Sequence, residues 1–193
     1  MAELLSYTGD EPLTFAQVAA HCRLDDDDSE RGLIEQMLIP AARQQAEVKT
    51  GAALRQAIYR EYWPSTRPDH QRLDKGQVRR LVGVGQFDLS PDSASYGAVQ
   101  PLAMPGHIVN RNGEAFLHLT GPRPPGLLIV DYEAGADLSH YPGVVQWLLL
   151  TVAALYENRE SLIVGNGAGV AIAELPARFT DSLLAPLTLP GLF

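Results

Sequence analysis

The stretch VVQWLLLTVAALY, residues 144–156, carries the most information about the fold of this chain. It follows Pro142, which suits the first position of a helix, and it is apolar around nearly all of its circumference. A helix without a polar face is normally buried on every side. In a chain of 193 residues, such burial can require a neighbouring subunit. We therefore expect a buried helix here, with Trp147, Leu148 and Leu155 as candidate assembly residues.

Two further helices are predicted upstream of this one. Thr14 and Gln17 form a capping-box pattern, which predicts a short helix that begins beside them. Residues 29–51 show apolar residues at spacings of three and four, as on one face of a helix. Pro40 interrupts that helix, and since proline removes a backbone hydrogen bond, we expect a kink at residues 36–39. The expected buried face comprises Leu33, Ile34, Met37, Leu38, Ala41, Ala42, Gln45 and Val48.

Residues 54–133 have a different character. Short runs rich in β-branched and aromatic residues alternate with turn signals, and Asn112-Gly113 between two such runs is typical of a β-hairpin. The expected strands are residues 54–63, 78–89, 107–109, 115–120 and 127–132, and residues 90–106 are expected to form a loop. The sequence therefore predicts antiparallel β structure between two helical segments.

These patterns together predict an α+β fold in a single domain, residues 1–193. Its expected core is mainly helical, with about four helices from residues 14–51 and 142–186, and the β region of about residues 54–133 is inserted into it. Residues 187–193 follow as an apolar tail in which prolines favour extended backbone. Dense exposed apolar groups usually mark a partner site, so we expect an assembly arm, and a tail folded back on its own chain is the alternative. Its candidate interface residues are Leu187, Leu189, Leu192 and Phe193.

The charge is acidic overall and unevenly distributed. The net charge of −8 and the isoelectric point near 5.0 do not favour general affinity for nucleic acid. Residues 55–80, however, carry 7 basic and 3 acidic residues. Such an alternating block is typical of the solvated face of a strand. The alternative is a phosphate-binding patch, as in a DNA-binding packaging factor.

The N-terminal sequence and the cysteine content favour a cytoplasmic protein. Residues 1–10 lack the basic residues and the apolar run of a signal peptide. The apolar stretch of residues 144–156 is too short to span a bilayer, so no membrane partner is expected. Cys22 is the only cysteine. It has no intrachain partner, and this fits a reducing compartment.

The sequence does not contain a pattern that predicts an enzyme. The glycine-rich segment, residues 165–169, lacks the lysine of a phosphate-binding loop. His107, His118 and Asp131 are the residues that strand pairing could bring together, as a two-histidine, one-carboxylate metal site. We therefore expect no catalytic residue, cofactor or metal, and keep a small metal-dependent enzyme that uses these three residues as an alternative.

Several local sequences occur in an order that points to one class of protein. They are TFAQVAAHCRL at residues 14–24, Leu33-Ile34 through Ala41-Ala42-Arg43 with Glu47 and Thr50-Gly51, VDYEAG at residues 130–135, YENRE at residues 156–160 and LLAP at residues 183–186. In this combination the chain resembles the head-tail connector (adaptor) proteins of tailed bacteriophages and related gene transfer agents. Residues 64–125 do not match the pattern of that family.

The resemblance implies a structural virion protein without chemistry of its own. Members of this family form a ring, usually of twelve subunits, which docks beneath the portal protein and leads to the stopper or tail-completion protein. Genomic DNA passes through the lumen of that ring without specific binding, and an acidic lumen would let DNA slide because phosphate binding requires concentrated Lys and Arg. The implied location is the virion neck, after assembly in the host cytoplasm.

Overall fold

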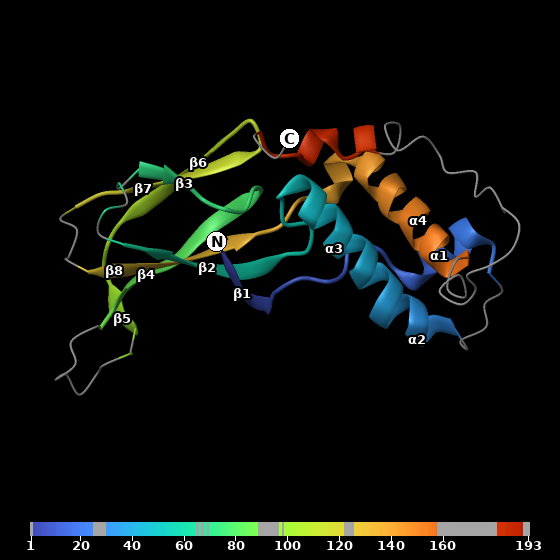
Figure 1. Ribbon diagram of the computed structural model, residues 1–193, viewed down its shortest axis with the longest axis horizontal. Coiled ribbons are helices and arrows are strands. Elements are labelled where there is room, and N and C mark those ends of the chain that lie inside the picture. The colour runs from blue at the N-terminus through green and yellow to red at the C-terminus, as the bar shows by residue number, and fades with distance from the viewer. Residues whose placement is uncertain are drawn as a thin grey trace, which may run out of the picture. The chain divides into compact units, whose positions relative to one another are not determined.

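The computed structural model describes residues 2–24, 30–64, 66, 68, 70–88, 97, 99–121, 126–157 and 181–190 (Figure 1). The chain divides into two compact units. The sheet unit comprises Met1–Asp10, Gly51–Ala136 and Leu189–Phe193, and the helical unit comprises Glu11–Thr50 and Asp137–Thr188.

The expected fold class is wrong in its balance, because the chain is α+β with a large share of sheet rather than mainly helical. Two antiparallel sheets are formed by the described residues, with strand orders β1-β2-β8-β4-β5 and β3-β7-β6. Their bounds are β1 Glu3–Tyr7, β2 Ala57–Trp63, β3 His70–Arg72, β4 Val78–Phe87, β5 Val99–Leu102, β6 Gly106–Arg111, β7 Glu114–Leu119 and β8 Leu127–Ala134. The β region therefore has its own core and is not an insertion into a helical one.

Five of these strands were predicted and three were not. β2, β4, β6, β7 and β8 confirm the expected runs, whereas β1, β3 and β5 lie at sheet edges and were missed. β1 has five exposed residues and therefore no alternation of buried and exposed positions. β3 and β5 are three and four residues long, so they are too short to show a period of two.

The hairpin that joins β6 to β7 confirms the Asn112-Gly113 prediction. Asn112 has φ 53° and Gly113 has φ 81°, so both central residues adopt the left-handed conformation of a type I′ turn. The turn fixes the register of the hairpin, in which Arg111 lies opposite Glu114.

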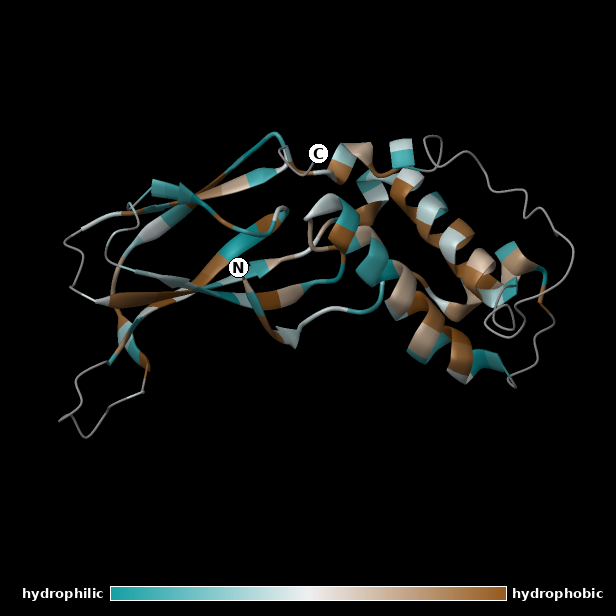
Figure 2. Cartoon of the chain, viewed as in Figure 1, coloured by the Kyte–Doolittle hydropathy of each residue, from teal (hydrophilic) through white to brown (hydrophobic). Residues whose placement is uncertain are grey.

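The core of the sheet unit follows from the alternation in β2. Ala57, Tyr59, Glu61 and Trp63 are buried, and the residues between them are half-buried or exposed. Figure 2 shows apolar residues along the strands of this unit. The buried apolar cluster also contains Ala53, Leu73, Val78, Val84, Ala115, Leu117, Leu119, Leu128, Val130, Tyr132 and Ala134.

The helical unit begins with α1, Phe15–Cys22, which has the expected capping box. The Thr14 hydroxyl accepts from the Gln17 N–H, and the Gln17 side chain accepts from the Thr14 N–H. The other elements are α2 Arg31–Leu33, η2 Ile34–Leu38, α3 Ile39–Thr50, η3 Leu138–His140, α4 Pro142–Glu157 and η4 Ala185–Leu187. The sequence also predicts a helix cap at Asp28 or Ser29 and a short last helix over about residues 176–184. The cap, most of that helix and the glycine-rich residues 165–169 lie outside the described residues.

Pro40 has a different effect from the one predicted. The stretch before it, η2, is a π-helix, in which the Ile39 N–H donates to the Ile34 carbonyl. Since Pro40 has no N–H and its ring crowds the carbonyl four residues before it, a wider turn relieves both problems. A π turn contains one extra residue, so the buried face is displaced along the sequence. The buried positions after it are Ile39, Ala42, Arg43, Ala46 and Thr50.

The displaced face explains three wrong expectations. Met37, Gln45 and Val48 were expected to be buried, but all three are exposed, Met37 by 63% and Val48 by 81%. A prediction that assumes a strict spacing of three and four residues does not account for the residue that a π turn adds to the helix.

Candidate functional site

The candidate assembly residues of α4 differ in their burial. Trp147 is 5% exposed and Leu148 is fully buried, and α4 contacts α1 and α3 of the helical unit. Leu155 is half-buried. The fully buried positions of α4 form one stripe, Val144, Trp147, Leu148 and Val152, so the helix is not buried on every side. Val145, Leu149, Leu150 and Ala153 are half-buried, like Leu155.

The candidate residues of the tail are placed only in part. Leu187 is fully buried and Leu189 is 3% exposed. A Cβ atom on Gly76 would lie 2.6 Å from Leu189 Cδ2, so the Leu189 side chain packs directly on the backbone there. Leu192 and Phe193 lie outside the described residues. The tail thus packs into the chain as far as Leu189, and its role in assembly stays a prediction.

Exposed large apolar residues mark surfaces that the sequence did not single out. In the helical unit they are Met37 and Val48. In the sheet unit they are Leu4, Leu5, Tyr7, Tyr62, Val82, Val99 and Val109. Three of these lie in β1, which is an edge strand paired only with β2 among the described residues.

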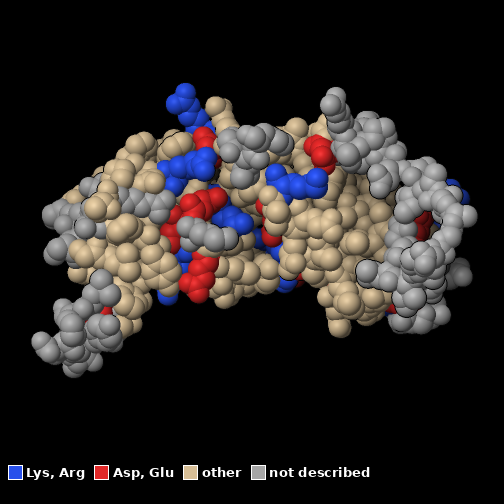
Figure 3. All heavy atoms as spheres, viewed as in Figure 1, with Lys and Arg blue, Asp and Glu red and all other residues tan. Residues whose placement is uncertain are grey.

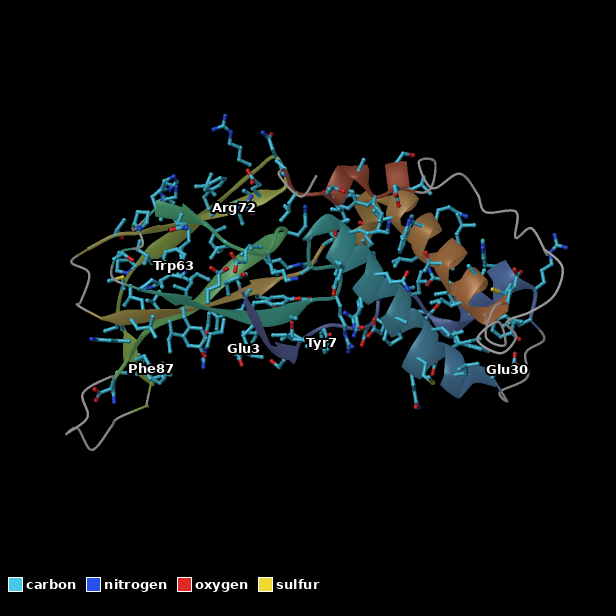
Figure 4. The ribbon with its side chains drawn as sticks, viewed as in Figure 1. Glu3, Tyr7, Glu30, Trp63, Arg72 and Phe87 are labelled. Carbon is cyan, nitrogen blue, oxygen red and sulfur yellow. The ribbon has the colours of Figure 1, made fainter. Side chains whose placement is uncertain are left out.

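The described arginines of the basic segment, residues 55–80, contact partners within the sheet unit. Arg60 donates twice to Asp131, with N–O distances of 2.7 and 2.8 Å. Arg72, labelled in Figure 4, lies 2.6 Å from Glu114. Figure 3 shows acidic and basic side chains interleaved on the visible face of this unit. The segment therefore presents paired charges there, and this arrangement does not favour the DNA-binding alternative.

Other basic side chains of this segment contact an aromatic ring or backbone carbonyls. The Arg55 guanidinium lies 4.1 Å from the centre of the Tyr7 ring and donates to the Gly9 carbonyl. Arg79 donates to the Gly135 carbonyl at 2.8 Å. These contacts hold β1 and the end of β8 in place, so the basic residues act within the sheet unit.

Glu133 is the point where three segments of the sheet unit meet. Its carboxylate accepts from Thr8 Oγ1 at 2.9 Å, from Gln56 Nε2 at 2.6 Å and from Arg80 Nε at 2.5 Å. Burial alone would raise the pKa of the Glu133 carboxyl. The hydrogen bonds from Arg80, Thr8 and Gln56 outweigh burial and hold its pKa below the ordinary value.

The lowered pKa of Glu133 predicts a pH dependence. Stability from this carboxylate is present above the ordinary pKa near 4.5 and is lost as the pH falls through the lower folded value. Glu133→Gln should therefore lower the free energy of unfolding by about 1–2 kcal/mol at pH 7. The difference from the parent should shrink as the pH falls below 4.5. Urea denaturation at pH 7 and at pH 3.5 measures it, with the exposed Glu35→Gln as the matched control. A difference that does not change with pH would contradict the assignment.

The alternative metal site does not form as expected. His107 and His118 do lie opposite each other across the hairpin. Asp131, however, belongs to β8 in the other sheet and is held by Arg60. In the part of the chain that the structure describes, no three or more His, Cys, Asp or Glu side chains are grouped as metal ligands.

A third histidine joins the pair and was missed. His70 in β3 lies opposite His118, with ring centres 3.9 Å apart. Because β3 is a three-residue edge strand, the sequence carried no signal that would place His70 beside the hairpin.

The lone cysteine lacks the surroundings of a nucleophile. Burial raises the pKa of the Cys22 thiol, and the nearby Glu157 charge raises it further. A thiol is reactive as the thiolate, so this environment disfavours the reactive form at neutral pH. Within the described residues, no helix has the length and apolar character needed to cross a bilayer.

Comparison with known proteins finds chains of similar fold but no matching protein family. No protein family and no curated protein matches the chain. A chain in the virion of a native gene transfer agent (GTA) particle matches with a TM-score of 0.71 and 22% identity, over 100% of both chains. A chain in the neck of an empty GTA particle, computed with C6 symmetry, matches with a TM-score of 0.67. One in the neck of a native GTA particle, computed with C12 symmetry, matches with 0.65.

Both neck chains are 22% identical to this chain, and each match covers 98% of this chain and 96% of the neck chain. The chain therefore has the fold of these GTA chains from end to end, which agrees with the resemblance inferred from its local sequences.

Proposed function

We propose that the chain is a structural subunit of a virion neck, a head-tail connector or adaptor of a tailed bacteriophage or gene transfer agent. The observation that carries this proposal is the match to GTA virion and neck chains over the full length of both partners. A shared single element would leave function open, but here both units of the chain are matched together. The local sequences at residues 14–51, 130–135 and 156–160 support the same assignment.

In this function the chain forms a closed ring around the DNA path. Support comes from the C6 and C12 symmetry with which the similar neck chains were computed. We infer twelve subunits, a portal protein on one face and a stopper or tail-completion protein on the other. Assembly would take place in the host cytoplasm, and the finished ring would belong to the virion neck.

Catalysis has no part in this function. Arg60 engages Asp131, the thiol of Cys22 is held in its neutral form, and the histidines of the small sheet stack instead of converging on a ligand. These observations support a protein that acts through its shape and its contacts.

The surface charge suits a lumen that passes DNA. The net charge is −8, and Arg60, Arg72 and Arg80 are each within ion-pair distance of a carboxylate. Since DNA binding relies on cations that displace phosphate counterions, such a surface offers weak retention. Genomic DNA would slide past it without specific binding.

The proposal predicts the behaviour of the purified chain. Native mass spectrometry and electron microscopy, with and without the matching portal protein, should show a closed ring, with twelve copies of the 21.0 kDa chain. Binding to a short DNA duplex should stay weak between 50 and 200 mM salt. A chain that remains monomeric with the portal present, or that binds DNA with a steep salt dependence, would contradict the connector function and favour the packaging-factor alternative.

A further inference from the structure

Three histidines form one row across the three-stranded sheet. His118 in β7 lies opposite His70 in β3 on one side and opposite His107 in β6 on the other. The ring centres are 3.9 Å apart for His70 and His118, and 4.9 Å apart for His118 and His107. The His118 and His107 rings are nearly parallel, at 9°. His118 is therefore the middle ring of a stack.

Few charged side chains lie beside this row among the residues that the structure describes. Since side chains alternate along a strand, the same face carries Arg72 from β3, Glu114 from β7 and Arg111 from β6. Arg72 pairs with Glu114 at 2.6 Å and also donates to the Pro190 carbonyl, and Arg111 lies opposite Glu114. Among the described residues of these three strands, Glu114 is the one carboxylate on this face, so the described part of the face offers little negative charge to offset protonated histidines.

Protonation of the row would place positive charges side by side. The pKa of His118 is lowered, first by partial desolvation and then by the charges of His70 and His107. A histidine whose pKa is lower in the folded than in the unfolded chain takes up protons when the structure opens. Its stabilising effect is complete above the ordinary pKa near 6.5 and is lost as the pH falls below that value.

Strand β3 is held on the small sheet in part by this row. It is a three-residue edge strand, held by pairing with β7 and by the hydrogen bond from the Leu73 N–H to the Ala115 carbonyl. Its first side chain, His70, contacts His118 and also stacks on Phe116, with ring centres 5.7 Å apart. Side-chain contact at the start of β3 is thus made through the stack of rings that has His118 at its centre.

We propose that the row of His70, His118 and His107 is an acid-sensitive latch, which holds β3 on the small sheet near neutral pH and releases it when the row is protonated. The latch is a property of the sheet unit and does not depend on the proposed neck function. In mildly acidic surroundings, the exposed face of this sheet would become more positive and would at the same time release its edge strand, β3.

Amide hydrogen exchange of the full chain tests the latch at the Leu73 N–H. The protection factor, corrected for the intrinsic pH dependence of exchange, should fall between pH 7.5 and pH 5.5, by up to about tenfold for each unit by which folding lowers the pKa of His118. His118→Phe keeps a ring in the stack but cannot be protonated, and it should lose less than about threefold. His140→Phe, which alters an exposed histidine of the helical unit, should behave like the parent.

Two outcomes of the exchange experiment would overturn the proposal. One is an equal fall in the parent and in His118→Phe, and the other is no fall in the parent. A titration of the His118 ring by NMR in the unmodified chain provides a second test that needs no variant. The latch requires a midpoint below 6.5 that rises when His70 and His107 are both replaced by asparagine. A midpoint at or above 6.5 in the parent would overturn it.

Discussion

Glu61→Ala is expected to lower the free energy of unfolding of the sheet unit by about 3–5 kcal/mol, because three donors lose a buried acceptor and each donor left unsatisfied costs about 1–3 kcal/mol. Glu61 is fully buried in β2. Its carboxylate accepts from the Trp63 indole N–H at 3.0 Å, from the Tyr132 hydroxyl at 2.7 Å and from the Asp74 N–H at 2.7 Å. Alanine removes the acceptor that these three donors share, and it also leaves a cavity.

The donors of this network stay in their hydrogen-bonding form over the working pH range. Burial raises the pKa of the Tyr132 hydroxyl, and the charge of Glu61 raises it further, so the hydroxyl remains a donor. Trp63, labelled in Figure 4, cannot act as an acceptor through its indole nitrogen. A substitution that keeps the shape but adds donors, Glu61→Gln, should therefore cost less than alanine but still about 1–3 kcal/mol.

Tryptophan fluorescence can report this loss for the sheet unit alone. The chain has two tryptophans, Trp63 in the sheet unit and Trp147 in the helical unit. In a Trp147→Phe background, urea denaturation followed at Trp63 measures the sheet unit. Glu35→Ala, which changes an exposed carboxylate paired with Arg31, is the control and should cost less than about 0.5 kcal/mol. A similarly small cost for Glu61→Ala would show that the network contributes little.

Leu148→Ala is expected to lower the free energy of unfolding of the helical unit by about 2–5 kcal/mol, through lost burial and a residual cavity. Leu148 is fully buried on the stripe of α4 that also holds Val144 and Val152. Since α4 contacts both α1 and α3, a cavity at this point loosens the centre of the unit. The opposite side of α4 is half-buried, so a truncation there should cost less.

The experiment on Leu148→Ala needs a control at an exposed position and a readout that reports the helical unit alone. Met37→Ala changes a side chain that is 63% exposed and should cost less than about 0.5 kcal/mol. Unfolding followed at Trp147, in a Trp63→Phe background, reports the helical unit. A cost for Leu148→Ala as small as that of the control would contradict its place in the core.

Local sequence patterns predict the structure correctly where chemistry within a few residues determines it. The capping box at Thr14 and the Asn112-Gly113 turn are of this kind. The predicted balance of helix and sheet is wrong because β1 pairs with β2 across about fifty residues of intervening chain. The exposed residues of β1 carry no pattern that predicts this pairing, so the sequence alone predicts the β region as an insertion.

Prediction of the candidate site has the same limit, because its residues come from strands that are distant in sequence. Pairing of His107 with His118 follows from the hairpin and was predicted, but the place of His70 requires knowledge of β3. The arginines of residues 55–80 form a basic run in sequence, whereas Asp131, Glu133 and Glu114 come from strands that are distant in sequence. The net charge of this stretch of sequence therefore differs from the net charge of the surface that it helps to form.

The measurement that tests the neck assignment most directly is an image of intact particles in which this chain carries an affinity tag bound to gold. Particles produced with the tagged chain would be purified and examined by electron microscopy, beside particles with the untagged chain. The account predicts gold at one point of each particle, the junction of head and tail, and none on the untagged particles. Gold spread over the head, gold along the tail, or particles without label while the tagged chain remains in the soluble fraction would contradict it.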